Sequence, residues 1–513
     1  MYKKPDPGQS PVARHSCRTF SIYQVITKMK RKILNLAPCV VACLVTALVT
    51  FGFIAGDKVM PVTTKSDKAR ALFKEAQIQL FEAGDARKAT ELFKQALDLD
   101  KEFALTNLYY GYMGFGNIER EKYINAAYEQ RDKVSEAEKH FIQAYGSLTN
   151  GKRDEAFDEL KAAIGLAPED KILTMHMAFM FANFEKYEEA LEYAKRSSEL
   201  DPDFSGAINL EGYILWHLEK PEEAEKLYAR AIEMNPGNTD FLDDYGQLLR
   251  GQGRVEEAIV MHTKALAIKE EYLSFLYLGH CYVADNNYPA ARDNYLKARD
   301  ASLTNGQKNF CLESVGYTYL YEGNLPEALA AFDRQIEFNK QLGGRDESII
   351  RTTVNKAYSC LLYEDYAAYG KMLEEYKMYL TSLNLSEPDR IFFGQFANLV
   401  EGYLYAYSGK TDLAQKYLSL YDQSLTDEEK DTYKSDLFEM KELIDYHKDN
   451  YKEAIASLEQ AGAMALYYAG LAYEKMGNIE KVKETYAKIS NNKLTSFDLA
   501  VTKPFARKRL AKL

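Results

Sequence analysis

The sequence predicts an all-α protein, a solenoid of stacked antiparallel helix pairs. A small alanine recurs at a nearly fixed interval, with spacings of 34, 34, 34 and 33 residues: Ala156, Ala190, Ala224, Ala258 and Ala291. Each alanine ends a six-residue phrase, such as Glu185–Ala190, in which a turn residue precedes an acidic helix start. The chain also has few glycine and proline residues for its 513 positions, with 29 and 13 of each, which favours helix throughout.

The repeat extends beyond this regular stretch. The same phrase occurs at Gly84–Ala89, Gly323–Ala328, Gly409–Ala414, Asp449–Ala454 and, more weakly, Gly477–Val482. Twelve residues before the alanine a second small residue returns, at Gly212, Gly246, Gly279, Gly316, Gly402 and Gly470. About twelve residues after it stand helix-ending prolines, at Pro168, Pro202 and Pro236. Small residues at two fixed places would let the two helices of a unit approach closely.

This combination resembles the tetratricopeptide repeat. The resemblance implies a right-handed superhelix of antiparallel helix pairs, whose inner groove binds peptide segments of partner proteins. Because each unit packs only on its neighbours, one array can use most of the chain. The carboxylate clamp of some family members, a pairing of Lys and Asn on successive units, is absent, since the equivalent positions carry Asn209 with Tyr213 and Asp243 with Gln247.

The N-terminal residues predict an export or anchoring segment. Residues 1–28 form a polar leader, either untranslated if the protein starts at Met29 or a short cytoplasmic tail. Residues 29–56 are expected to be a signal peptide or a transmembrane anchor, because Ile33–Gly56 contains no charged residue and could span a bilayer as a hydrophobic helix. A third alternative is a lipoprotein signal acylated at Cys43. The lysines and arginine at 28–32 should stay in the cytoplasm.

The solenoid is predicted over residues 57–513. Val59–Ser66 is expected to be extended, with Ser66 capping the first helix, and Ser135–Glu138 has the spacing of a capping box. A degenerate unit should turn near Gly116-Asn117. The repeats are regular over 136–300 and irregular over 301–490, where Tyr363–Ala368 is a weak phrase with Lys356 in place of the small residue. Residues 500–513 predict a basic capping helix, or alternatively a membrane-surface or partner helix.

Composition and spacing argue against several other classes. The net charge is -11, with no long basic stripe in the repeats, so nucleic acid is not an expected partner. The histidines and cysteines lack metal-ligand spacing, and no nucleophile–base pairing or phosphate loop is found, so no catalytic residue, cofactor or metal is predicted. Asp240, Asp243 and Asp244 gather at one helix start, where carboxylates favour the helix dipole; cation binding there is the less favoured alternative.

The candidate site is the groove. In the family, the first helix of each pair lines the groove, and numbering from the small alanine assigns the inward positions of that helix. These positions carry aromatic residues and isolated polar groups, a combination that suits protein recognition. The assigned residues are Met175, Phe179, Asn183, Asn209, Tyr213, Trp216, His217, Asp243, Gln247, Arg250, Leu276, His280, Glu313, Tyr317, Tyr321, Tyr403 and Tyr407.

The sequence therefore predicts a non-catalytic scaffold that binds a protein or peptide in this groove. The N-terminal segment places the repeats outside the cytoplasm, in the cell envelope, periplasmic in a Gram-negative cell and either membrane-anchored or secreted. Two alternatives remain: a structural envelope component that associates with itself, and an enzyme with a site in the irregular residues 341–448. The sequence does not identify the partner.

Overall fold

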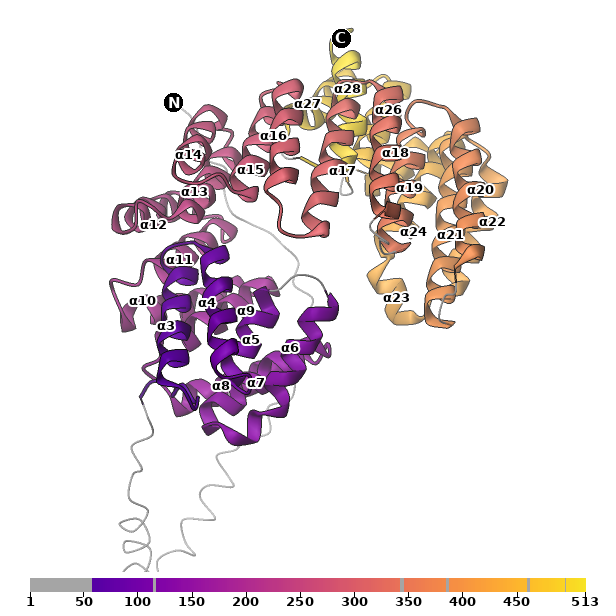
Figure 1. The fold of residues 1–513 in the computed structure, drawn as a ribbon. Helices are drawn as coiled ribbons and strands as arrows, with labels where there is room; N and C mark the ends of the chain where they lie inside the picture. Colours follow the sequence, from indigo (N-terminus) through magenta and orange to yellow (C-terminus); the bar gives the residue numbers. More distant parts are fainter. Residues whose placement is uncertain (1–57, 114–116, 342–345, 384–386, 459–461, 494) are drawn as a thin grey trace, which may run out of the picture. The chain divides into compact units, whose positions relative to one another are not determined.

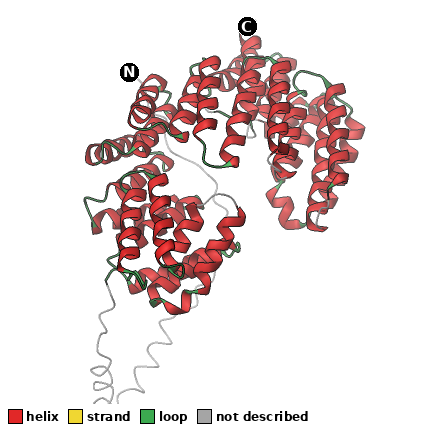
Figure 2. Cartoon of the chain, viewed as in Figure 1, coloured by secondary structure: helices red, strands yellow, loops and turns green. Residues whose placement is uncertain are grey.

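The structure is a computed structural model. It describes residues 58–513 apart from 114–116, 342–345, 384–386, 459–461 and 494. Every regular element in these ranges is a helix and none is a strand (Figure 2). No helix in the described ranges is both long and apolar enough to cross a bilayer. The hydrophobic helix predicted within residues 29–56, and the leader before it, lie outside the described residues.

The helices form consecutive pairs along the chain (Figure 1). In chain order they are α3 (Asp67–Phe81), α4 (Ala86–Leu99), α5 (Ala104–Met113), α6 (Asn117–Glu129), η1 (Arg131–Lys133), α7 (Glu136–Thr149), α8 (Arg153–Leu166), α9 (Lys171–Asn183), α10 (Tyr187–Leu200), α11 (Ser205–His217), α12 (Pro221–Met234), α13 (Thr239–Gly251), α14 (Val255–Ile268), α15 (Tyr272–Ala284), α16 (Tyr288–Ala301), α17 (Asn305–Tyr321), α18 (Leu325–Gln341), α19 (Asp346–Ser359), α20 (Tyr366–Ser382), α21 (Glu387–Tyr407), α22 (Thr411–Ser424), α23 (Asp427–Thr432), α24 (Lys434–His447), α25 (Tyr451–Leu458), α26 (Ala463–Lys475), α27 (Ile479–Asn491) and α28 (Phe497–Leu510).

Except in the phrase that begins at Tyr363, the first residue of each predicted phrase adopts the left-handed conformation that ends the first helix of a pair. Six of these residues are glycines, with φ between 67° and 80°: Gly84, Gly151, Gly253, Gly323, Gly409 and Gly477. Non-glycine residues in this conformation are Glu185, Glu219, Asn286, Glu364 and Asp449, with φ between 57° and 64°. Glycine enters this region without strain, whereas a Cβ makes it costly. The predicted turn near Gly116-Asn117 falls partly on residues 114–116, which lie outside the described residues, and Asn117 is the first residue of α6.

The small residues hold the two helices of a pair together as the sequence predicts. The alanine of each phrase is fully buried, for example Ala224 and Ala258. In five pairs the glycine twelve residues earlier faces a ring on the second helix, whereas Gly402 faces the Met440 side chain. A Cβ on Gly246 would lie 2.5 Å from the His262 ring, and one on Gly279 would lie 2.5 Å from the Tyr295 ring. The glycine therefore makes room for a ring that lies four residues after the alanine.

One predicted phrase is wrong by a single residue. The left-handed residue of its turn is Glu364, not Tyr363, and Asp365 caps α20. The position equivalent to the repeated alanine is thus Tyr369, which is fully buried and donates from its hydroxyl to the Val400 carbonyl at 2.7 Å. In this frame the second small residue is the buried Ala357 rather than position 356. A tyrosine at the alanine position concealed the unit.

Helix length changes along the chain. The helices from α7 to α16 are 13 or 14 residues long. Farther on, α17, α18 and α20 have 17 residues and α21 has 21. The predicted capping box is confirmed: the Ser135 side chain accepts from the Glu138 N–H, and Glu138 in turn accepts from the Ser135 N–H.

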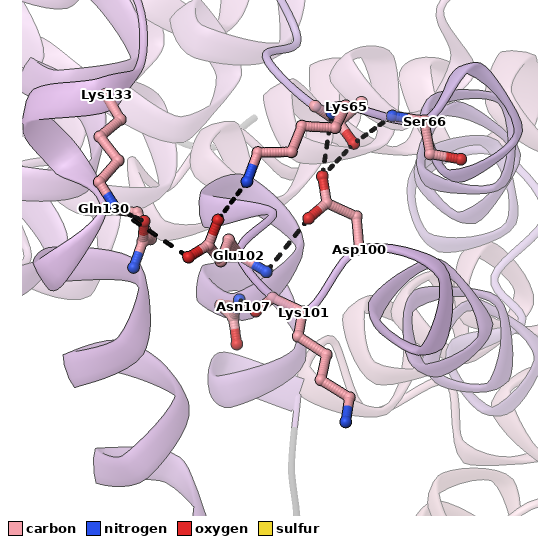
Figure 3. Close-up of polar contacts among 9 residues, drawn as sticks. Lys65, Ser66, Asp100, Lys101, Glu102, Asn107, Gln130 and Lys133 are labelled. Carbon is pink, nitrogen blue, oxygen red and sulfur yellow. Dashed lines mark hydrogen bonds and ion pairs between the residues drawn. The ribbon is translucent and has the colours of Figure 1, made fainter.

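The segment before α3 is extended and is held by carboxylates from the following repeats. The Met60 N–H donates to Asp170 at 3.0 Å, the Thr63 N–H donates to Glu138 at 2.7 Å, and the Lys65 N–H donates to Asp100 at 3.0 Å. Figure 3 shows the last of these contacts, beside an ion pair between Lys65 and Glu102. Buried carboxylates thereby satisfy the backbone donors of a chain segment that has no secondary structure.

The C-terminal helix α28 does more than cap the array. It packs on the preceding helices α26 and α27 and also on α17, which lies far earlier in the chain (Figure 1). Lys503 on α28 is 1% exposed and donates through Nζ to the Asn492 carbonyl. Burial lowers the pKa of the Lys503 ammonium to about 8. The predicted basic helix therefore buries part of its charge inside the repeats.

Candidate functional site

A cavity of about 350 Å3 lies among the first helices of three consecutive pairs, α9, α11 and α13, and we call it the groove cavity. Residues of α3 and α15 complete its lining. Six of the predicted groove residues line it together: Met175, Phe179, Asn183, Asn209, Tyr213 and Asp243. The volume is at the lower end of the range for binding pockets, enough for one or two side chains rather than a large cofactor.

Three carboxylates at the start of α13 line the groove cavity. Asp243 is satisfied within the fold: Oδ1 lies 2.7 Å from His262 Nδ1, and Oδ2 accepts from the Ser274 hydroxyl at 2.6 Å. Asp244 accepts from Asn209 Nδ2 at 2.6 Å. No side chain in the described part of the chain donates a hydrogen bond to the Asp240 carboxylate. Asp243 is therefore structural, whereas Asp240 and Asp244 keep acceptor capacity.

The environment of these carboxylates disfavours negative charge. Burial, aided by the neighbouring Asp244, Glu271 and Asp243 carboxylates, raises the pKa of Asp240 to about 7, although Lys269 opposes the shift. Burial also raises the pKa of Asp244 to about 6, with Asp243 adding to the shift and Asn209 opposing it. Both groups would ionise more readily if a positive charge entered the cavity.

Asn209 contributes an unused acceptor to the same lining. Its side chain is 8% exposed, and Nδ2 is used by Asp244. Its Oδ1 is buried and has no hydrogen-bond partner among the described residues. A buried amide oxygen without a partner costs free energy of about 1–3 kcal/mol, which a donor from a bound molecule would recover. The free oxygen thus points to a ligand that brings hydrogen-bond donors.

Aromatic rings form the apolar part of the lining. Phe179 on α9 lines the cavity and is 38% exposed. Tyr213 on α11 is half-buried, and Tyr277 on α15 also lines the cavity. Trp216 and the exposed His217 lie farther along α11, where the His217 ring stacks on Tyr187 with centroids 4.6 Å apart. Trp216 and His217 are not part of the cavity lining.

The turn between α3 and α4 closes one side of the groove cavity. Phe81 lines it, and a Cβ on Gly206 would lie only 2.2 Å from the Phe81 carbonyl oxygen. Asn238 Nδ2 donates to the Glu82 carbonyl at 2.7 Å, and Lys269 Nζ pairs with Asp85 at 2.8 Å. Glycine at 206 is therefore required for the first repeat to approach the later ones this closely.

The chain's own C-terminal segment covers other predicted groove residues. Arg250 donates to the Lys493 carbonyl at 3.2 Å, and the Tyr321 hydroxyl lies 3.1 Å from both the Ser496 N–H nitrogen and its carbonyl oxygen. Two further predicted groove residues are covered. His280 Nδ1 lies 3.4 Å from the Thr495 hydroxyl, and the Tyr317 ring centroid lies 5.6 Å from that of Phe497. Residues 493 and 495–497 therefore occupy this part of the predicted groove.

The remaining predicted residues serve the fold. Leu276 is buried in the hydrophobic core, and Gln247 accepts from the Arg250 guanidinium at 2.8 Å. The other three make polar contacts within the fold. Glu313 accepts a hydrogen bond from Asn355 at 2.7 Å. The Tyr403 hydroxyl lies 3.5 Å from Asp436, and the Tyr407 hydroxyl donates to Glu439 at 3.0 Å. These residues do not meet the groove cavity.

Several residues that line the groove cavity are not among the predicted groove residues, and four of them are Asp240, Asp244, Phe81 and Tyr277. Asp240 and Asp244 were noticed only as an acidic helix start, whereas Phe81 and Tyr277 gave no signal of their own. The counting rule assigned Leu276, one residue before Tyr277. A tyrosine beside an assigned apolar position could have indicated Tyr277, but nothing local to Phe81 predicts a contact with a helix more than one hundred residues later.

Residues 209–262 match the family model described as tetratricopeptide repeat. They comprise most of α11, all of α12 and α13 and the first half of α14. This stretch is therefore similar to tetratricopeptide repeats, and the other helix pairs share its turn geometry, with a left-handed residue between their two helices. A search of curated protein sequences found no match.

Solved structures with a similar fold include TTC0263, a tetratricopeptide-repeat protein of Thermus thermophilus, at 16% identity and a TM-score of 0.32; the match covers 35% of this chain and 98% of that one. PilW, a type IV pilus biogenesis factor, is 15% identical with a TM-score of 0.34, covering 42% and 96%. MamA from Desulfovibrio magneticus RS-1 is 20% identical with a TM-score of 0.28, covering 33% and 95%.

Proposed function

We propose that this protein is a non-catalytic scaffold of the cell envelope that binds an extended peptide segment of a partner protein in the groove cavity. Tetratricopeptide repeats as a class are scaffolds for protein–protein interaction. The observation that carries the proposal is that inward residues from three consecutive pairs line one cavity, with the Phe179 ring exposed at 38%. An exposed aromatic beside buried polar groups is the composition of an interaction hot spot.

The C-terminal segment covers the inner surface next to the groove cavity, which supports the choice of this cavity as the binding site. The C-terminal segment occupies the positions around Arg250 and Tyr321, so an external peptide cannot use them without displacing it. The groove cavity lies on the preceding pairs, and six predicted residues line it. Its size suits one or two anchoring side chains of a longer segment.

Site-specific photocrosslinking tests the proposal. The full chain would carry benzoylphenylalanine at position 179, and the matched control would carry it at Met378 on α20, which is 70% exposed and does not line the cavity. We expect a discrete crosslinked protein from position 179 that is absent from position 378. Identical products from both positions would contradict binding in the groove cavity.

Location in the envelope rests on residues 29–56 and needs its own test. The mass of the mature N-terminus, measured on protein purified from membranes, distinguishes cleavage from a retained anchor and from acylation at Cys43. Protease added to intact spheroplasts should digest the repeats if they lie outside the cytoplasm. Protection of the repeats in intact spheroplasts, with digestion after lysis, would contradict the proposed location.

A further inference from the structure

We propose that the groove cavity selects a lysine or arginine side chain of the bound peptide, with Asp240, Asp244 and Asn209 as its polar partners. The inference rests on the proposed function, since it names the chemistry of the segment that the scaffold binds. The residues on α11 and α13 that carry it lie close together, as shown by the 2.6 Å contact between Asn209 Nδ2 and Asp244.

The polar lining calls for donors. Asp240 accepts no hydrogen bond from a side chain of the described residues, and Asn209 Oδ1 is a buried acceptor without a partner there. An acidic side chain would meet like charge and would bring no donor to either group. An ammonium carries three donors and a guanidinium five, and both are cationic, so they satisfy the free acceptors and the local charge together.

The apolar lining suits the stem of the same side chains. Lysine and arginine have long aliphatic stems that pack on apolar surface while the head reaches polar partners. Phe179 and Tyr213 line the cavity together with the three aspartates. A cation beside aromatic rings gains further attraction of about 0.5–2 kcal/mol. The aromatic residues and the two carboxylates thus form one site, in which the rings contact the aliphatic part of a lysine or arginine and the carboxylates bind its charged group.

The raised pKa of Asp240 also favours a cationic side chain as the ligand. Asp240 has a pKa of about 7, and the charged groups that face it are Asp243 and Asp244 on its own helix and Glu271 and Lys269 before α15. A bound cation stabilises the ionised carboxylates, so binding near pH 6.5 should release protons. An uncharged or acidic side chain would release none.

Selection from a phage-displayed library of twelve-residue random peptides on the full chain tests the inference. Selected peptides would be synthesised with fluorescein, and their Kd would be measured by anisotropy. We expect them to share one lysine or arginine, and we expect its replacement by norleucine to weaken binding at least about tenfold. Peptides that share no basic residue would overturn the inference.

Matched protein variants assign the effect to the cavity. The double variant Asp240→Asn, Asp244→Asn should weaken the same peptides at least about tenfold and remove the proton release measured by calorimetry in two buffers. The control Asp158→Asn changes an exposed carboxylate on α8 and should leave Kd unchanged. An unchanged Kd in the double variant would overturn the inference, and an unchanged circular dichroism spectrum verifies that the variant is folded.

Two further arms separate this inference from the proposed function. The double variant Phe179→Ala, Tyr213→Ala should weaken every selected peptide that uses the cavity, whatever its charge. If this variant weakens binding while the aspartate variant does not, selection of a basic side chain is contradicted and peptide binding in the groove cavity is supported. If neither variant weakens binding, both proposals are contradicted. Free spermidine should compete poorly, and competition equal to that of the peptide would overturn recognition of a peptide side chain.

Discussion

Asn238 joins two distant parts of the chain: its Nδ2 donates to the Glu82 carbonyl oxygen at 2.7 Å, while its Oδ1 caps α13 by accepting from the Asp240 N–H at 2.9 Å. One side chain thus starts the helix that carries the acidic lining and fixes the α3–α4 turn beside it. The two roles can be separated, because aspartate caps a helix as well as asparagine but has no donor.

Asn238→Asp should therefore keep α13 and lose the link to Glu82. A carboxylate facing a carbonyl oxygen leaves both acceptors unsatisfied, at an expected cost of about 1–3 kcal/mol. Amide hydrogen exchange should accelerate in residues 79–86 and stay unchanged in α13. Asn238→Ala should accelerate both. Equal protection of 79–86 in the Asp variant and the native chain would contradict the role of this bond.

Gly206→Ala should displace the α3–α4 turn. The new methyl group would lie 2.2 Å from the Phe81 carbonyl oxygen, a backbone atom that can move only with its turn. We expect destabilisation of about 1–3 kcal/mol from overpacking. Gly165→Ala is the control, since its Cβ meets nothing within 4 Å, and it should stabilise α8 by about 0.5–1 kcal/mol. Thermal unfolding compares the two, and a stabilising Gly206→Ala would show that the contact is loose.

Stability should fall as pH rises through the range in which Asp240 and Asp244 ionise. Their pKa values, about 7 and about 6 in the fold, lie above the usual value of 3.8, so between pH 4 and 7 the folded chain holds more protons than the unfolded chain. Asp240→Asn and Asp244→Asn should each raise stability at pH 8, by about 1–3 kcal/mol. The unfolding midpoint measured from pH 4 to 8 should become flatter in both variants.

Asp158→Asn is the control for this pH series and should leave the profile as in the native chain. A profile equally steep in the aspartate variants of α13 would assign the pH dependence to other groups. Because a bound cation favours the ionised carboxylates, basic peptides should also bind more tightly at pH 8 than at pH 5.

Glu219→Gly should stabilise the protein. Glu219 has φ 58°, where a Cβ costs about 1–2 kcal/mol, and the gain is partly offset by the entropy of glycine in the unfolded chain, so about 0.5–1 kcal/mol should remain. Asn286→Gly should gain less or lose stability, because asparagine tolerates this conformation and its Oδ1 accepts from Tyr288 and Arg507. Denaturant midpoints would rank the two, and the opposite order would contradict this reading of the turns.

Tyr321→Phe should loosen the C-terminal segment. It removes the hydroxyl that both donates to and accepts from Ser496, leaving two backbone groups without partners. Hydrogen exchange in residues 495–500 should accelerate, while Tyr282→Phe, a change on α15 whose hydroxyl makes no hydrogen bond to the described residues, should leave it unchanged. Equal exchange in both variants would show that the covering of α17 does not depend on this contact.

Most of the fold was predictable from the sequence because its signals are local. A left-handed residue such as Gly84 or Glu219, followed five positions later by a buried alanine, marks each turn within a short stretch of chain. The unit at Glu364 was displaced by one residue because Tyr369 replaces the alanine. The Tyr369 hydroxyl donates to the carbonyl of Val400 on α21, and no pattern in the sequence near Tyr369 indicates this contact.

The candidate site was only partly predictable. Counting along the repeat placed Phe179, Asn209 and Tyr213 on the inner face, and the structure brings them together around one cavity. The same counting assigned Arg250 and Tyr321, which the C-terminal segment covers. Periodicity states which side of a helix faces inward, but it carries no information on what part of the chain lies there. Contacts across 175 or more residues depend on the stacking of all intervening units.

The position of residues 495–510 has a consequence for synthesis. The ribosome completes α17 well before it reaches Ser496, which is 175 residues beyond Tyr321. At about 5–20 residues per second this interval lasts roughly 10–35 s. During that time the positions on α15 and α17 that this segment later covers, such as His280 and Tyr321, lack that cover. The nascent protein therefore carries an uncovered inner surface that a chaperone could bind, and these contacts form only after Ser496 has been synthesised.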